Sequence, residues 1–141
     1  MSELIVETSA GKPAPGFRHD TADLVSFLSF VAAERYGSTH PLSVLANRLR
    51  RRHRIDLGPL WEFYEADAED EQDRAQLERI WQAPGPVAQA AAEAAAALQA
   101  DPDAAALAAG FPHLGGLLED LAANARWAQS RGARLRLTYR L

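Results

Sequence analysis

A run of apolar residues between positions 24 and 31 constrains the fold of this chain most strongly. These residues recur at intervals of three and four, the spacing that places side chains on one face of an α-helix. Because the face is broad, we expect the helix to be buried at the centre of the molecule. Its members are Leu24, Phe27, Leu28 and Val31, with Val25 and Phe30 at the sides.

The flanking residues indicate where this helix begins and ends. Asp20 or Thr21 can accept a hydrogen bond from the first backbone N–H groups, and Asp23 places negative charge at the positive end of the helix dipole. Gly37 can adopt the left-handed conformation that often follows a helix. The sequence therefore predicts a helix from about Asp20 to Tyr36.

A second apolar stripe lies near the other end of the chain, and its spacing is again helical. We expect it to pack against the first helix, so that the two together form the centre of the core. Trp127 lies off its centre line and is expected to cover an edge. The stripe consists of Leu114, Leu117, Leu118, Leu121, Ala125 and Ala128.

Shorter helices are predicted between these two. Pro41 suits the first position of one of them, and Asp101 can cap another. Pro84 and Pro86 are expected to end a third. An alanine-rich segment favours a helix but buries little area, so it should be close-packed or peripheral. The predicted ranges are 41–54, 69–82 (with Leu77, Ile80 and Trp81 on the core), 87–100 and 103–109.

Both ends of the sequence alternate between apolar and polar residues, which is the pattern of half-buried strands. A lone strand cannot satisfy its backbone groups, so we expect residues 3–8 and 133–141 to pair antiparallel. Glu3 and Glu7 would then lie across from arginines. No other segment has a comparable strand pattern, and a two-stranded ribbon must lean on a helix or on another chain. The apolar faces would be Leu4 and Val6, and Leu135, Leu137, Tyr139 and Leu141.

Length and composition fit one globular domain. A chain of 141 residues can bury a core without cross-links. It has no cysteine, which excludes disulfides and thiolate metal sites and suits a reducing cytoplasm. No apolar run is long enough for a membrane span and the first residues are acidic, so we expect neither a membrane span nor a secretory signal. The predicted fold is therefore mainly α: one domain over residues 1–141, a compact bundle of five to six helices with a two-stranded antiparallel ribbon formed by the termini.

An arginine cluster occupies the end of the predicted helix 41–54. Guanidinium groups match phosphate geometry, so the cluster could contact nucleic acid. It could equally be a solvated helix end whose cations complement the dipole. The net charge of −4 disfavours nucleic acid, and a helix-turn-helix is disfavoured because the following segment carries Glu62 and Glu65. The cluster consists of Arg48, Arg50, Arg51, Arg52 and Arg54 around His53.

An acidic segment follows, with seven carboxylates and no basic residue between Glu62 and Asp73. Clustered carboxylates can bind a divalent cation, but the spacing of a calcium loop is absent. Trp61, Phe63 and Tyr64 flank the segment, and aromatic residues beside charge are typical of protein-binding hot spots. Trp61 is expected in the core, whereas Tyr64 could be either a core or a contact residue.

The sequence contains no recognisable catalytic or cofactor signature. The histidines lack metal-ligand spacing, and neither a nucleophile elbow nor a phosphate-binding loop is present. His113 is expected at a helix start in solvent. An enzyme would need a pocket assembled from distant residues, such as His19, Tyr64 and dispersed carboxylates. We therefore predict no metal and no cofactor.

These features favour a small non-catalytic interaction or regulatory protein. Its partner would be another protein or a second copy of the chain, and segregated charge would set partner choice and orientation. The edge of a terminal strand could also pair with another chain. The alternatives are a nucleic-acid-associated regulator that uses the arginine cluster, and a small enzyme. The expected partner-binding residues are Arg48, Arg50, Arg51, Arg52, Arg54, Glu62, Tyr64 and Glu65.

Overall fold

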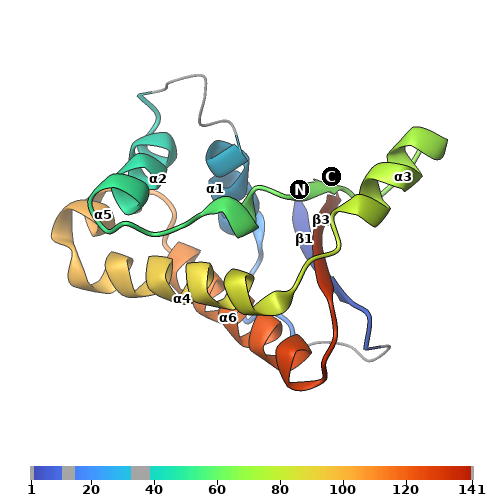
Figure 1. Cartoon of the computed structure of the whole chain (residues 1–141). Coiled ribbons are helices and arrows are strands. Elements are labelled where there is room, and N and C mark those ends of the chain that lie inside the picture. Colours follow the sequence, from blue (N-terminus) through green and yellow to red (C-terminus); the bar gives the residue numbers. More distant parts are fainter. Residues whose placement is uncertain (1, 11–14, 33–38, 141) are drawn as a thin grey trace.

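The computed structural model describes residues 2–10, 15–32 and 39–140. The elements in chain order are β1 (Glu3–Thr8), α1 (Ala22–Ala32), α2 (Pro41–Arg51), the short 3-10 helix η2 (Gly58–Leu60), β2 (Phe63–Glu65), α3 (Glu71–Arg79), α4 (Pro84–Ala100), α5 (Pro102–Leu107), α6 (Leu114–Ser130) and β3 (Leu135–Arg140). Most helices lie together on one side of a small sheet, and α3 projects on the other side (Figure 1). The predicted mainly helical class is confirmed. Within the described ranges, no helix is long and apolar enough to cross a bilayer.

The two predicted apolar stripes lie in one contiguous core. α1 and α6 contact each other, although the most extensive contact of α6 is with α4. Burial of this apolar surface is the main stabilising term for a fold of this kind. The completely buried side chains of the two helices include Leu24, Phe27, Leu28 and Val31 on α1 and Leu114, Leu117, Leu118 and Leu121 on α6.

The alanine-rich helix α4 is close-packed and not peripheral. Ala90, Ala91 and Ala94 are buried against the core. Alanine side chains are short and lose no rotamer entropy on burial, which allows α4 to lie along α6 over much of its length. α4 begins at Pro84, and α3 already ends at Arg79. The expectation that the proline pair ends α3 is therefore wrong: it lies in the first turn of α4, where N–H groups have no intrahelical acceptor.

The beginning of α1 is fixed by two neighbouring side chains with different roles. Asp20 Oδ1 accepts a hydrogen bond from the Ala22 N–H at 2.8 Å. The buried Thr21 hydroxyl instead accepts from the Leu4 N–H, also at 2.8 Å, which joins β1 to the start of α1. The predicted helix end at Tyr36 and Gly37 lies outside the described residues.

α2 ends at Arg51, earlier than the predicted Arg54. Arg54 has a φ of 55°, in the left-handed region that residues other than glycine rarely adopt. The chain reverses there, and the Ile55 N–H donates to the Leu49 carbonyl at 3.0 Å. Ile55 is buried as a result, and its burial offsets the cost of the backbone conformation.

The terminal strands pair antiparallel with the predicted charge register, but the sheet has three strands in the order β1-β3-β2. Glu3 lies opposite Arg140, and Glu7 opposite Arg136. β2 runs parallel to β3 on its other edge. The two-stranded ribbon is therefore a mixed sheet with β3 at its centre. A strand of three residues is too short to show a period in the sequence, which is why this segment was not expected to be a strand.

The two faces of the sheet have different covers. Leu135 and Leu137 are completely buried on the face toward the bundle. On the other face, the Arg136 guanidinium donates to the Leu77 carbonyl of α3 at 3.0 Å and lies 4.6 Å from the ring centroid of Trp81. Trp81 is half-buried there, so its expected place in the core is wrong. Arg136 also pairs with Glu7, and it thereby links β1, β3 and α3.

Substitution of Phe27 tests the central position of α1. Because this side chain is completely buried, Phe27→Ala should lower the free energy of unfolding by about 3–5 kcal/mol. Urea denaturation followed by circular dichroism would measure the change. Val44→Ala, at a site that is 39% exposed on α2, is the control and should change stability by less than about 0.5 kcal/mol. Equal effects of the two substitutions would contradict a core built on α1.

Removal of residues 134–141 tests the central position of β3. Both outer strands would lose their hydrogen-bonding partner, so the cooperative thermal transition should disappear. Arg134→Ala, at an exposed side chain just before β3, should leave the transition intact. A shortened chain that still unfolds cooperatively would show that the sheet is dispensable.

Candidate interaction surface

Two of the five clustered arginines make contacts inside the molecule. Arg48 Nε lies 2.6 Å from Asp101 Oδ2, and its second amino group lies 3.3 Å from Asp103 Oδ2. Arg50 donates to the Val31 carbonyl at 3.0 Å, with its guanidinium over the ring of Trp61. Both side chains therefore hold α2 in place. The expectation that they face a partner is not supported by these contacts.

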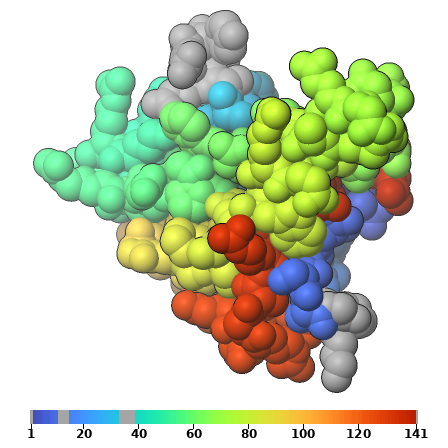
Figure 2. Space-filling model, turned by 45° about the vertical axis from the view of Figure 1, so that its right-hand side comes forward, coloured from blue at the N-terminus to red at the C-terminus, as the bar shows by residue number. Residues whose placement is uncertain are grey.

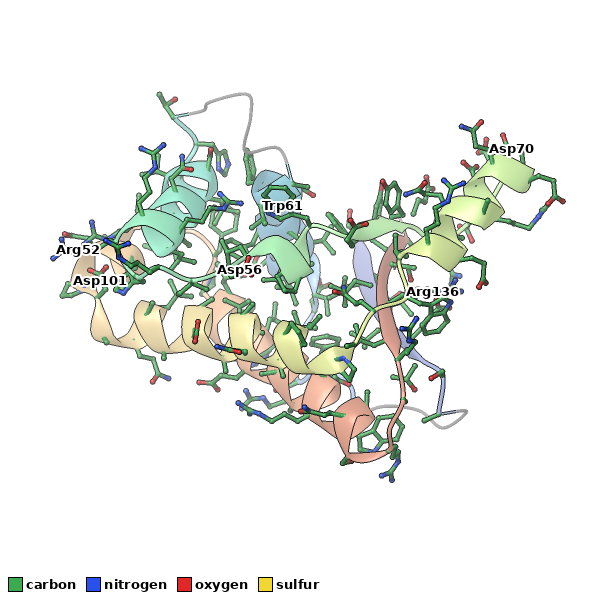
Figure 3. All side chains as sticks on the ribbon, in the orientation of Figure 1. Arg52, Asp56, Trp61, Asp70, Asp101 and Arg136 are labelled. Atoms are coloured by element: carbon green, nitrogen blue, oxygen red, sulfur yellow. The ribbon has the colours of Figure 1, made fainter. Side chains whose placement is uncertain are left out.

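Asp101 is the centre of a compact polar cluster at the junction of α2, α4 and α5. Its carboxylate is largely buried; Oδ1 accepts from the Asp103 N–H at 3.0 Å as the predicted cap of α5, and Oδ2 lies 2.7 Å from His53 Nε2. The hydrogen bonds from Arg48 and then from His53 hold the pKa of Asp101 far below its usual range. The Asp101 hydrogen bond in turn raises the pKa of Arg48. Figure 3 shows Asp101 beside the end of α2.

The other three arginines form what we call the basic face: Arg51, Arg52 and Arg54. Their side chains are exposed, and none makes an ion pair with the described part of the chain. Arg54 also lines a shallow groove of about 360 Å³, together with His53, Ile55 and four residues of α4: Glu93, Ala96, Ala97 and Ala100. The basic face therefore combines free cations with a small apolar surface.

A second groove, of about 490 Å³, lies where β2, β3 and α3 meet. We call it the acidic groove. Its four carboxylates come from β2, the linker and the first turn of α3, and two tyrosines also line it, together with Gln72, Gln76 and Leu77. Figure 2 shows α3, in yellow-green, projecting from the body beside the sheet. The carboxylates are Glu65, Asp67, Glu69 and Asp73, and the tyrosines are Tyr64 and Tyr139.

The carboxylates of the acidic groove are only partly engaged within the chain. Asp67 lies 3.5 Å from the Arg140 guanidinium, and Asp73 accepts from the Glu69 N–H at 3.0 Å. The side chains of Glu65 and Glu69 are exposed and make no ion pair with the described residues. The groove therefore carries excess negative charge close to aromatic rings.

The three aromatic residues of this region differ in their exposure to solvent and in their contacts. Leu60 takes the completely buried position, so Trp61 lies outside with 43% of its surface exposed. The expectation of a core position for Trp61 is therefore wrong. Tyr64 is 41% exposed and lines the acidic groove, while Phe63 packs at 5.3 Å against the ring of Tyr139. Glu62 is exposed outside the groove lining.

The acidic groove contains residues that sequence reasoning did not single out. The acidic segment between Glu62 and Asp73 includes Asp67, Glu69 and Asp73, but nothing in its sequence distinguishes these three from their neighbours. Tyr139 was assigned to the apolar face of a ribbon. The parallel pairing of β2 with β3 places Glu65 beside Tyr139, and no local pattern in the sequence indicates that pairing.

The residues considered for an assembled enzyme pocket are not brought together. His19 and Asp20 line a groove of about 440 Å³ near the start of α1, whereas Tyr64 lines the acidic groove. His19 stacks on His113, with ring centroids 4.2 Å apart, and His113 is exposed as expected. Within the part of the chain that the structure describes, no group of three or more histidines and carboxylates is placed to hold a metal ion.

Comparison of the chain with protein-family models, curated proteins and solved structures found no match. The functional argument therefore depends on the geometry and charge of these surfaces.

Substitution of Asp101 tests the polar cluster. Because the pKa of Asp101 is lowered in the folded state, its ionised form stabilises the fold fully above the usual aspartate pKa of about 3.9 and loses this effect as the pH falls toward the folded-state value. Asp101→Asn should therefore lower Tm at neutral pH, and the difference from wild type should shrink progressively below about pH 4.

Asp103→Asn is the matched control, since this carboxylate contacts the same arginine but is 78% exposed. Solvent screening should keep its effect small. Differential scanning calorimetry between pH 2 and 7 would measure both variants. An Asp101 effect that does not change with pH would contradict a stabilising ionised carboxylate.

Proposed function

We propose that this protein is a non-catalytic protein-binding subunit whose acidic groove receives a basic surface or segment of its partner. The observation that carries the proposal is the combination of four carboxylates and two tyrosines around one groove of about 490 Å³. A partner must supply positive charge there, because bringing a neutral or acidic surface against unpaired carboxylates would desolvate them without compensation.

The aromatic rings of the groove suit the side chains of lysine and arginine. These residues pack their aliphatic stems on apolar surface and can place their cations against an aromatic face. Tyr64 is 41% exposed and lines the groove, as do Tyr139 and the carboxylates. A basic side chain of the partner would therefore find both aromatic rings and carboxylates in this groove.

The position of β2 would also allow an extended segment of a partner, such as a short basic peptide, to pair with the sheet. β2 is an outer strand of the sheet, and an outer strand can bind an added strand through backbone hydrogen bonds. The Ala66 N–H donates to the Tyr139 carbonyl at 2.8 Å. In a parallel strand, the backbone N–H and C=O groups of every second residue point toward the same neighbouring strand. Since Ala66 bonds to β3, the backbone groups of Glu65 point away from β3.

The nucleic-acid alternative has less support. Of the five clustered arginines, Arg48 and Arg50 are used inside the molecule, which leaves the three of the basic face for phosphate contacts. A protein that binds duplex DNA tightly usually neutralises more phosphates than three side chains can reach.

Binding of a short lysine- and arginine-rich peptide to the purified chain tests the proposal. Glu65→Gln with Glu69→Gln should raise the Kd about tenfold, since two exposed ion pairs of about 0.7 kcal/mol each would be lost. Isothermal titration calorimetry would measure it. Glu93→Gln, at an exposed site on α4 outside the acidic groove, should leave the Kd unchanged.

Salt provides an independent check on the same peptide. Binding should weaken when NaCl is raised to about 0.5 M, because exposed charges are then screened over a few ångströms. Peptide binding that is insensitive to both the groove substitutions and salt would rule out the acidic groove as the binding site.

A further inference from the structure

The chain itself carries the exposed positive charge that the acidic groove requires of a partner. The basic face presents three exposed arginines that make no ion pair within the described part of the molecule. We infer that the partner of the acidic groove is a second copy of this chain, whose basic face covers the groove and the exposed side of α3. This inference rests on the proposed function, and it names the partner.

The two surfaces lie at opposite ends of the molecule, so one copy cannot join them within itself. Figure 3 shows Arg52 at the end of α2 and Asp70 at the start of α3, on opposite sides of the bundle. In Figure 2 the residues of α2, in teal, and those of α3, in yellow-green, likewise project in different directions. Contact between the surfaces must therefore be made between copies.

The shape of α3 fits this role. α3 has nine residues, and of these only Leu77 is buried. A polar helix of this length is marginal without packing, so a surface laid along its exposed side would stabilise it. Its first turn carries Asp73, one of the carboxylates of the acidic groove, and follows the exposed cap residue Asp70, whereas Glu71 is paired with Arg74.

The basic face offers a matching shape as well as opposite charge. The shallow groove beside it is lined by Ala96, Ala97 and Ala100, by His53, Arg54 and Ile55, and by the carboxylate of Glu93. The small alanine side chains leave room for a helix to approach closely, while the arginines supply the positive charge that outnumbers Glu93. α3 of one copy would thus lie over alanines of the next, with its carboxylates near Arg51, Arg52 and Arg54.

Charge reversal with complementation tests the contact. Sedimentation velocity at about 0.05 M NaCl should show the wild type above the monomer mass, with the association lost at about 0.5 M NaCl. R51E/R52E and E65R/E69R should each be monomeric under the low-salt condition. An equimolar mixture of the two variants should associate again, because each supplies the surface that the other lacks.

Two controls separate charge at these sites from general effects. Arg126→Glu changes an exposed arginine on α6 that belongs to neither surface, and it should associate as the wild type does. Circular dichroism would show that the reversed variants keep the helical content of the wild type. Because the two surfaces differ, the contact is compatible both with a two-fold pair that makes it twice and with a head-to-tail series.

A wild-type chain that stays monomeric at low salt up to about 1 mM would overturn self-association. So would a mixture of the reversed variants that fails to associate. Neither result would affect binding of the basic peptide to the groove, so the failure of this inference can be told apart from the failure of the proposed function.

Discussion

The central strand β3 has to find hydrogen-bonding partners on both of its edges, and the rest of this structure depends on that constraint. Leu135, Leu137 and Thr138 of β3 are buried, so an unpaired backbone group in this strand would be costly. β1 satisfies one edge. On the other edge β2 pairs near the end of β3, and Gln82 pairs with Leu135 near its beginning.

These two attachments join both ends of the segment that contains α3 to β3. The Ala66 N–H donates to Tyr139 before α3, and Gln82 exchanges two hydrogen bonds with Leu135 after it, at 2.8 and 3.0 Å. Arg136 of β3 also donates a hydrogen bond to the Leu77 carbonyl of α3. A helix with little buried apolar surface is thereby fixed in place, and the acidic groove is the space between this helix and the end of the sheet.

Burial divides the charged residues of the protein into two groups. Arg48 and Asp101 are close enough to lock two helices together, and their mutual hydrogen bonds shift the pKa values of both. Arg51, Arg52 and Arg54 are near them in sequence but remain in solvent. Arginine thus stabilises the fold at position 48 and, one helical turn further along the chain, is exposed to a partner. We propose that this partner is a second copy of the chain.

The pattern of apolar residues by itself indicated the main helices, their buried faces and which residues of the terminal strands share a face, because periods of 3.6 and 2 are local properties of the chain. Phe27 and Leu121 are buried for that reason, whereas the register that sets Glu7 opposite Arg136 is a property of the folded sheet. The tertiary structure alone decided that Phe63–Glu65 is a strand, that Trp61 and Trp81 lie outside the core, and that Arg48 faces inward while Arg52 does not. Each of these features depends on contacts with residues that are distant in sequence. The three residues of β2 are, in addition, too few to form a local pattern that would indicate a strand.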